Sequence, residues 1–248
     1  RLLFELDELN DANRLSPEEK YRMLKKNERV VKQRPETVLR LATRAMEAGH
    51  YEDAIDIMDN NFIIESEGAR EQQDNYLNSY LVLAMQQAKK GRYEAANRNL
   101  DKALAYPIGL YGRSVYAKIY YTAGMVAQRQ GDEAKAKDMF NQAVEVNADR
   151  DTEAVYYRAM ALKELGKDAE AKALLEGILA NLGKESDTFF SQFGGSSDLD
   201  TKKSENLYFE GLANEGLGNK DVAKQKYREA LKLNPANVWS KVHLEFIE

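Results

Sequence analysis

The sequence predicts an all-α fold in which about five helix-turn-helix repeats stack into a solenoid. Five glycines carry this prediction, because each stands between two stretches of helical, apolar periodicity: Gly49, Gly91, Gly131, Gly166 and Gly218. Residues of fixed size recur at fixed distances from these glycines. The composition agrees with a helical chain, since its 248 residues include only four prolines and fifteen glycines.

Three columns of residues keep the same distance from the turn glycine in all five copies. Seven residues before it stands a small residue: Ala42, Ala84, Gly124, Ala159 or Gly211. Five residues after it stands an alanine: Ala54, Ala96, Ala136, Ala171 or Ala223. Nine residues after it stands a bulky apolar residue: Met58, Leu100, Phe140, Leu175 or Tyr227. These columns predict two antiparallel helices in close contact across a left-handed glycine, with the bulky residue filling the space toward the next hairpin.

The repeats are expected to occupy the middle of one continuous domain. Residues 1–34 should form leading helices, residues 35–235 the five repeats, and residues 236–248 a capping helix. A non-helical insertion is expected at about residues 181–203, because Gly-Gly-Ser-Ser interrupts the helical pattern there. The phenylalanines of this insertion, within Phe189–Phe193, are expected to pack on the solenoid, since they should not be left in water.

Local signals place the flanking helices. A capping box that starts at Ser16 predicts a helix up to about Gln33. In the capping helix, Trp239, Val242 and Phe246 share one face, as covering the exposed end of the last repeat requires.

The repeat columns resemble the tetratricopeptide-repeat (TPR) family, whose motif has small, Gly, Ala, bulky aromatic, Ala and Pro positions in this order. The last repeat matches best, with Gly211, Gly218, Ala223, Tyr227, Ala230 and Pro235. The resemblance covers roughly residues 35–248. It implies a right-handed α-solenoid of TPR-like repeats that binds a protein or peptide.

A narrower resemblance is carried by stretches such as Ala105-Tyr106-Pro107-Ile108-Gly109-Leu110. They are similar to the C-terminal TPR region of large bacterial proteins that carry an uncharacterised, mutarotase-like domain upstream. This resemblance fits a chain that begins with Arg1 rather than Met. It implies that the partner is a separate protein or peptide, or that upstream domain.

Composition argues against several classes of function. A net charge of −5 gives no overall attraction to a nucleic-acid backbone, and no apolar run is long enough to insert into a membrane. The absence of cysteine excludes thiolate metal sites, and two histidines provide little material for acid–base catalysis. We therefore expect no catalytic, cofactor-binding or metal-binding residues, and no enzyme.

The basic residues and the histidines have ordinary interpretations. Residues 20–34 contain seven basic side chains, but Tyr21 is their only aromatic residue, so a solvated face or one that meets an acidic domain is favoured over a nucleic-acid surface. His50 follows a turn glycine and is expected in solvent. His243 has no partner in the local sequence and is expected to be structural or exposed.

The resemblance points to the first helix of each repeat, which lines the concave groove of TPR solenoids. Six, nine and ten residues before the turn glycine, the later repeats carry the candidate partner-binding residues Tyr121, Met125, Tyr156, Tyr157, Met160 and Tyr208. Arg40 is the only cation in these columns, so the Lys, Asn and Arg clamp of some TPR domains is absent. The groove is expected to suit an apolar helix or extended peptide. Alternatively, these side chains only pack between adjacent helices or under the insertion.

The sequence thus predicts a non-enzymatic scaffold for protein–protein or interdomain interaction. The alternative is an accessory or oligomerisation module of a larger carbohydrate-active bacterial enzyme. A soluble protein of the bacterial cytoplasm or periplasm is expected, and the choice of compartment, the oligomeric state and the partner stay open.

Overall fold

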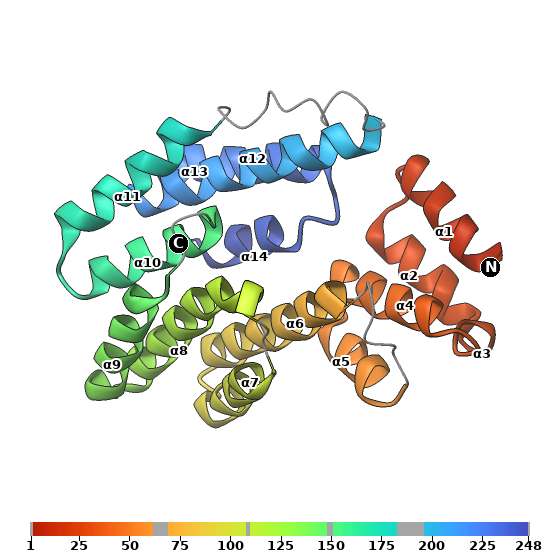
Figure 1. Cartoon of the computed structure of the whole chain (residues 1–248), viewed down its shortest axis with the longest axis horizontal. Helices are drawn as coiled ribbons and strands as arrows, with labels where there is room; N and C mark the ends of the chain where they lie inside the picture. Colours follow the sequence, from red (N-terminus) through yellow and green to blue (C-terminus); the bar gives the residue numbers. More distant parts are fainter. Residues whose placement is uncertain (1, 62–68, 108–109, 148–150, 183–195, 248) are drawn as a thin grey trace. The chain divides into compact units, whose positions relative to one another are not determined.

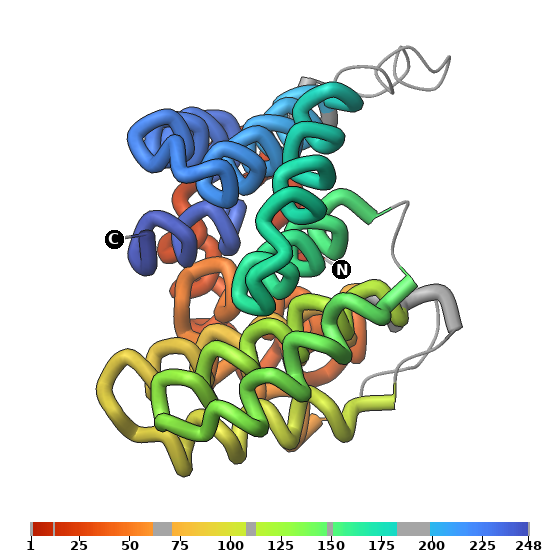
Figure 2. The backbone as a smooth tube through the Cα atoms, turned by 90° about the vertical axis from the view of Figure 1, so that its left-hand side faces the viewer, coloured from red at the N-terminus to blue at the C-terminus, as the bar shows by residue number. Residues whose placement is uncertain are grey.

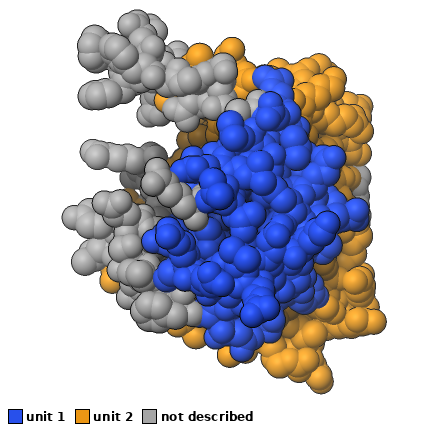
Figure 3. All heavy atoms as spheres, turned by 90° about the vertical axis from the view of Figure 1, so that its right-hand side faces the viewer, with its two compact units in different colours: residues 1–83 blue, residues 84–248 orange. Residues whose placement is uncertain are grey.

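The computed structural model describes residues 2–61, 69–107, 110–147, 151–182 and 196–247. Regular structure in these ranges consists of fourteen α-helices and one 3-10 helix, without a strand. The all-α class is confirmed. The chain forms two compact units, unit 1 (residues 1–83) and unit 2 (residues 84–248), which Figure 3 colours separately. The expectation of one continuous domain stays a prediction.

Unit 1 contains the leading helices and the first repeat. Its helices are α1 (Leu2–Ala12), α2 (Pro17–Lys26), α3 (Glu28–Val31), α4 (Pro35–Ala48), α5 (Tyr51–Asp59) and most of α6 (Ala69–Lys89), which continues into unit 2. The Ser16 capping box is present, because its hydroxyl accepts from the Glu19 amide and the Glu19 carboxylate accepts from the Ser16 amide. The helix predicted to reach Gln33 ends earlier, at Lys26.

Asn27 explains that early end. Its backbone angles, φ −104° and ψ 19°, leave the helical region, and its side-chain amide donates to the Met23 carbonyl at 2.8 Å. An asparagine side chain competes in this way with the helix for backbone hydrogen bonds. Periodicity continues across Asn27, which is why the sequence pattern did not reveal the break between α2 and α3.

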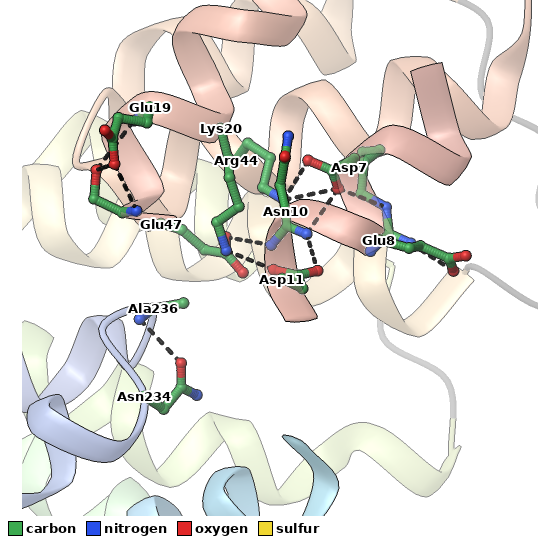
Figure 4. Close-up of polar contacts among 12 residues, drawn as sticks. Asp7, Glu8, Asn10, Asp11, Glu19, Lys20, Arg44, Glu47, Asn234 and Ala236 are labelled. Atoms are coloured by element: carbon green, nitrogen blue, oxygen red, sulfur yellow. Dashed lines mark hydrogen bonds and ion pairs between the residues drawn. The ribbon is translucent and has the colours of Figure 1, made fainter. Parts of the chain in front are cut away.

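A buried ionic network attaches α1 to the other helices of unit 1 (Figure 4). The guanidinium of Arg44 on α4 donates from Nη2 to Asp7 Oδ2 at 2.7 Å and from Nη1 to Glu47 Oε2 at 2.8 Å, and it also pairs with Asp11. Lys20 of α2 donates to Asp11 Oδ1 at 2.6 Å. Asp7 is fully buried, so α1 is held by charges that have left water.

Unit 2 contains the other repeats. After the end of α6 come α7 (Tyr93–Ala105), a 3-10 helix (Leu110–Val115), α8 (Tyr116–Gln130), α9 (Glu133–Glu145), α10 (Thr152–Glu164), α11 (Asp168–Asn181), α12 (Ser196–Gly216), α13 (Lys220–Leu233) and α14 (Val238–Phe246). Figures 1 and 2 show α8 and α9 side by side, and α12 and α13 pair in the same way.

The five predicted turns are confirmed. All five turn glycines have positive φ, between 72° at Gly91 and 92° at Gly49. In each turn, the glycine amide donates to the carbonyl three residues back, and the next amide donates to the carbonyl four residues before the glycine, as at Gly131 and Asp132. This paired bonding closes a helix on a left-handed residue, which glycine adopts without strain.

The small residues of the first helices contact the bulky residues of the second helices. A Cβ added to Gly124 would lie 2.4 Å from the ring of Phe140, and one added to Gly211 would lie 2.4 Å from the ring of Tyr227. These bulky residues therefore pack first against their own hairpin, rather than only between hairpins as predicted. Leu175 does reach the next repeat, since a Cβ on Gly216 would lie 2.7 Å from its Cδ2.

The insertion before the last repeat is shorter than expected. Helix α12 begins at Ser196, so residues 196–203 are helical rather than part of a non-helical insertion. The predicted packing of Phe189–Phe193 lies outside the described residues.

Candidate functional site

The first helices of the repeats in unit 2 bring most of the predicted binding residues together. Tyr121 and Met125 project from α8, and Tyr156, Tyr157 and Met160 project from α10. These five line one cavity of about 180 Å³, whereas Tyr208 of α12 is not among its lining residues. Tyr156, Tyr157 and Tyr208 are buried, and Tyr121, Met125 and Met160 are half-buried.

The same cavity is lined by residues from three other elements. The end of α6 contributes Met85 and Ala88, α12 contributes Glu215, and the terminal helix α14 contributes His243 and Phe246. Methionine and aromatic side chains make most of the wall, so the surface is apolar and adaptable.

Helix α14 lies along these first helices, between α12 and α8 in Figure 1. The ammonium of Lys118 on α8 lies 3.8 Å from the ring centroid of Trp239. At the other end, Lys89 of α6 lies 4.7 Å from the ring centroid of Phe246 and donates to the Glu245 carbonyl at 3.0 Å. Helix α14 therefore packs on α13 and also contacts the first helices α6, α8, α10 and α12.

His243 occupies the centre of this contact. Its Nδ1 lies 2.8 Å from Glu215 Oε2, and its Nε2 lies 3.4 Å from the Tyr157 hydroxyl. Its ring centroid is 5.8 Å from that of Tyr156 and 5.3 Å from that of Tyr227. The imidazole thus joins an aromatic cluster to a single, half-buried carboxylate.

The Glu215–His243 pair was missed by sequence reasoning, which found no partner for His243. The available signals were weak. His243 lies on the apolar face of α14, and Glu215 is the only acid three residues before a turn glycine. Neither signal identifies the other residue, because the two lie on different helices.

Hydrogen bonds and charge decide the protonation of the buried groups. Burial alone would raise the pKa of Glu215, but the charge of His243 and hydrogen bonds from His243, Tyr227 and Tyr156 outweigh burial and hold this pKa below its usual value. Burial raises the pKa of the Tyr156, Tyr157 and Tyr208 hydroxyls well above the ordinary tyrosine value. These hydroxyls stay neutral near pH 7.

A second polar contact borders the tyrosines. The Tyr208 hydroxyl donates to Glu153 Oε1 at 2.6 Å, and Lys118 donates to the other oxygen of this carboxylate at 2.6 Å. Neutral hydroxyls and paired charges therefore lie beside the tyrosines of the apolar cavity. In the described part of the chain, no group of three or more His, Asp or Glu side chains could hold a metal ion.

Two basic side chains of unit 1 make contacts that the sequence did not reveal. His50 was expected in solvent, and its side chain is 41% exposed, but its Nε2 lies 2.8 Å from Glu18 Oε2 and its ring centroid lies 4.5 Å from that of Tyr21. Lys20 was expected on a solvated face or on one that meets an acidic domain, but it is buried inside unit 1, where Asp11 of α1 supplies a counter-charge. Among the helices that the structure describes, none has the length and apolar composition needed to cross a bilayer.

Comparisons with known proteins agree with the repeat organisation. Family models described as tetratricopeptide repeat match residues 18–123, 117–150, 153–181 and 204–237. They leave residues 182–203 unmatched, within the predicted insertion. Curated protein sequences yield no match to the chain.

Two solved structures are similar to the chain. One is YrrB, a TPR protein with an unusual peptide-binding site, which is 17% identical, covers 90% of this chain and 98% of its own, and has a TM-score of 0.35. The other is the C-terminal part of a TPR repeat-containing protein from Cytophaga hutchinsonii. It is 15% identical, covers 96% of this chain and 98% of its own, and has a TM-score of 0.30.

Proposed function

Because the chain belongs to the tetratricopeptide-repeat family, we propose that it is a non-enzymatic scaffold whose concave face in unit 2 binds a protein segment. TPR solenoids present extended binding surfaces, so the repeats themselves indicate a protein-interaction scaffold. That the concave face of unit 2 is the binding surface is our proposal. One observation supports it most: Tyr121, Met125, Tyr156, Tyr157 and Met160, from two successive first helices, line one apolar cavity.

The chemistry of the face favours an apolar or aromatic segment. Its methionines adapt to side chains of different shape, and its tyrosines offer hydroxyl groups beside apolar rings. The alternative of an accessory module in a larger carbohydrate-active enzyme stays a prediction, since neither the fold nor the groove bears on it.

Selection from a phage library of random twelve-residue peptides tests the proposal on the full chain. We expect enrichment of apolar and aromatic peptides, and about tenfold or more weaker binding of these peptides to the double variant Met125→Lys, Met160→Lys, because two buried contacts are replaced by charges. Both methionines are half-buried, so circular dichroism should show that the variant keeps its helical fold.

Met139 provides a matched control. It is a half-buried methionine on α9 and does not line the cavity. Met139→Lys should therefore leave peptide binding unchanged. Equal loss of binding in both variants, or no enrichment at all, would contradict the proposal.

A further inference from the structure

The first helices of unit 2, which are the end of α6 together with α8, α10 and α12, form a groove in which α14 lies. We infer that α14 is an intramolecular ligand of this groove and that the external partner is an amphipathic helix with the same recognition pattern. This inference rests on the proposed function and specifies its ligand. The partner helix carries apolar residues at positions i, i+3 and i+7 and an imidazole or cationic residue at i+4. Binding of the partner displaces α14.

The recognition pattern is read from α14 itself. Trp239, Val242, His243 and Phe246 are spaced i, i+3, i+4 and i+7, which places them on one face of a helix. Trp239 and His243 are each only 8% exposed, and Val242 is 2% exposed. This spacing is how an amphipathic helix docks in a hydrophobic groove.

Charge fixes both the residue at i+4 and the direction of the helix. Glu215 accepts a hydrogen bond from His243 in the middle of the groove. A partner helix therefore needs a positively charged hydrogen-bond donor at position i+4. Lys89 donates to the Glu245 carbonyl in the last turn of α14, where a cation complements the negative end of the helix dipole. A partner helix that directs its C-terminus toward Lys89 receives the same stabilisation.

Helix α14 does not fill the groove, which gives an external helix something to gain. The cavity of about 180 Å³ remains next to Phe246, bounded by Met85, Met125 and Met160, and Arg129 is also in its wall. A partner with a larger apolar side chain there, or with an acidic residue facing Arg129, makes contacts that α14 lacks.

Helix α14 is also separable from the repeats. It has nine residues, and an isolated helix of that length is marginal in water, so its order depends on docking. It joins α13 through a turn in which Asn234 Oδ1 accepts from the Ala236 amide at 3.0 Å (Figure 4). The α12–α13 hairpin keeps its own Gly211–Tyr227 contact without α14.

The test is binding of a fluorescent synthetic peptide with the sequence of residues 236–248 to the full chain. The tethered α14 competes at an effective concentration in the millimolar range, so wild-type chain should bind the peptide weakly. The double variant Val242→Asp, Phe246→Asp disrupts the apolar face of the tethered helix and leaves the residues of α6, α8, α10 and α12 that contact α14 unchanged. It should bind the wild-type peptide about tenfold or more tightly than the wild-type chain does.

Two controls define specificity. A peptide with the same two aspartates should not bind, and adding Glu215→Gln to the variant chain should weaken binding of the wild-type peptide. If the α14 peptide fails to bind while library peptides still bind in the groove, the inference is overturned and the proposed function stands. Loss of both kinds of binding overturns both.

If the double variant does not fold, amide hydrogen exchange on the wild-type chain tests the inference instead. The α14 amides should exchange faster than those of α8 and α10, and an excess of the peptide should accelerate them further. Exchange of α14 only by global unfolding would make α14 part of the core and overturn the inference. A wild-type dimer that dissociates on dilution and is lost in the double variant would assign the groove to a second copy and also overturn it.

Discussion

The two flanking helices of the chain are attached by opposite chemistry. In unit 1, α1 is held by the buried charges of Asp7 and Arg44, and the partly exposed Asp11 is a second partner of Arg44. In unit 2, α14 is held by aromatic packing around one ion pair, Glu215–His243. Buried ion pairs accept only a geometry that satisfies every charge, whereas an aromatic and methionine surface can repack. The comparison indicates that α1 is a fixed part of its unit and that α14 is exchangeable.

Protonation in unit 1 follows from the same network. Burial raises the pKa of Glu47, and the nearby Arg44 charge opposes burial without cancelling it. At Asp11, burial is outweighed by Lys20 and Arg44, so the pKa of this carboxyl lies below its usual value. The centre of the network is thus Arg44, which serves three carboxylates.

The largest expected effect comes from breaking the ionic attachment with Arg44→Met. Removing the cation leaves Asp7 buried without its main partner, which should lower the free energy of unfolding by about 3–5 kcal/mol. Urea denaturation followed by circular dichroism measures the loss. Adding Asp7→Asn should recover part of it, because the orphaned charge is removed.

Arg40→Met is the matched control. Arg40 is more exposed and lies 3.4 Å from Asp7, so its loss should lower the free energy of unfolding by about 1 kcal/mol or less. If Arg40→Met and Arg44→Met have equal effects, Arg44 is not the centre of the attachment.

An intermediate effect is expected in the repeat core on which α14 docks. Gly124→Ala places a Cβ 2.4 Å from the Phe140 ring and should destabilise the chain by about 1–3 kcal/mol through overpacking. The control is Gly177→Ala in α11, where an added Cβ would have no atom of another element within 4 Å. Alanine should stabilise this helix by about 0.5–1 kcal/mol. Melting temperatures that move in the same direction for both variants would contradict this packing.

The smallest expected effect concerns the ion pair beneath α14. The folded pKa of Glu215 lies below its unfolded value, so its stabilisation is complete above about pH 4.5 and is lost as the pH falls through the folded pKa. Glu215→Gln should lower the free energy of unfolding by about 1.5 kcal/mol at pH 6, and the difference from wild type should shrink toward pH 3.

Tyr227→Phe sharpens this measurement. It removes the hydroxyl that donates to Glu215 at 2.5 Å and keeps the His243 partner. It should therefore reduce the pH dependence less than Glu215→Gln does. A difference between wild type and Glu215→Gln that does not change with pH would show that the carboxylate contributes no charge-dependent stability.

The fold was largely predictable because its signals repeat along the chain. Each turn glycine, such as Gly131, lies at a fixed distance from the residues that pack around it, so spacing alone reveals the hairpin. The Asn27 break was not predictable from periodicity, because one side chain causes it. The Arg44–Asp7 and Glu215–His243 pairs join helices that are not neighbours in sequence, and no local spacing encodes such contacts.

The position of α14 after the repeats has a consequence for synthesis. Its contact with α6 joins Lys89 and Glu245, which are 156 residues apart. The ribosome adds residues at about 5–20 per second, and earlier segments fold first. Helices α8 and α10 therefore emerge several seconds before the helix that docks on them. A partner present during translation meets a groove that is still open.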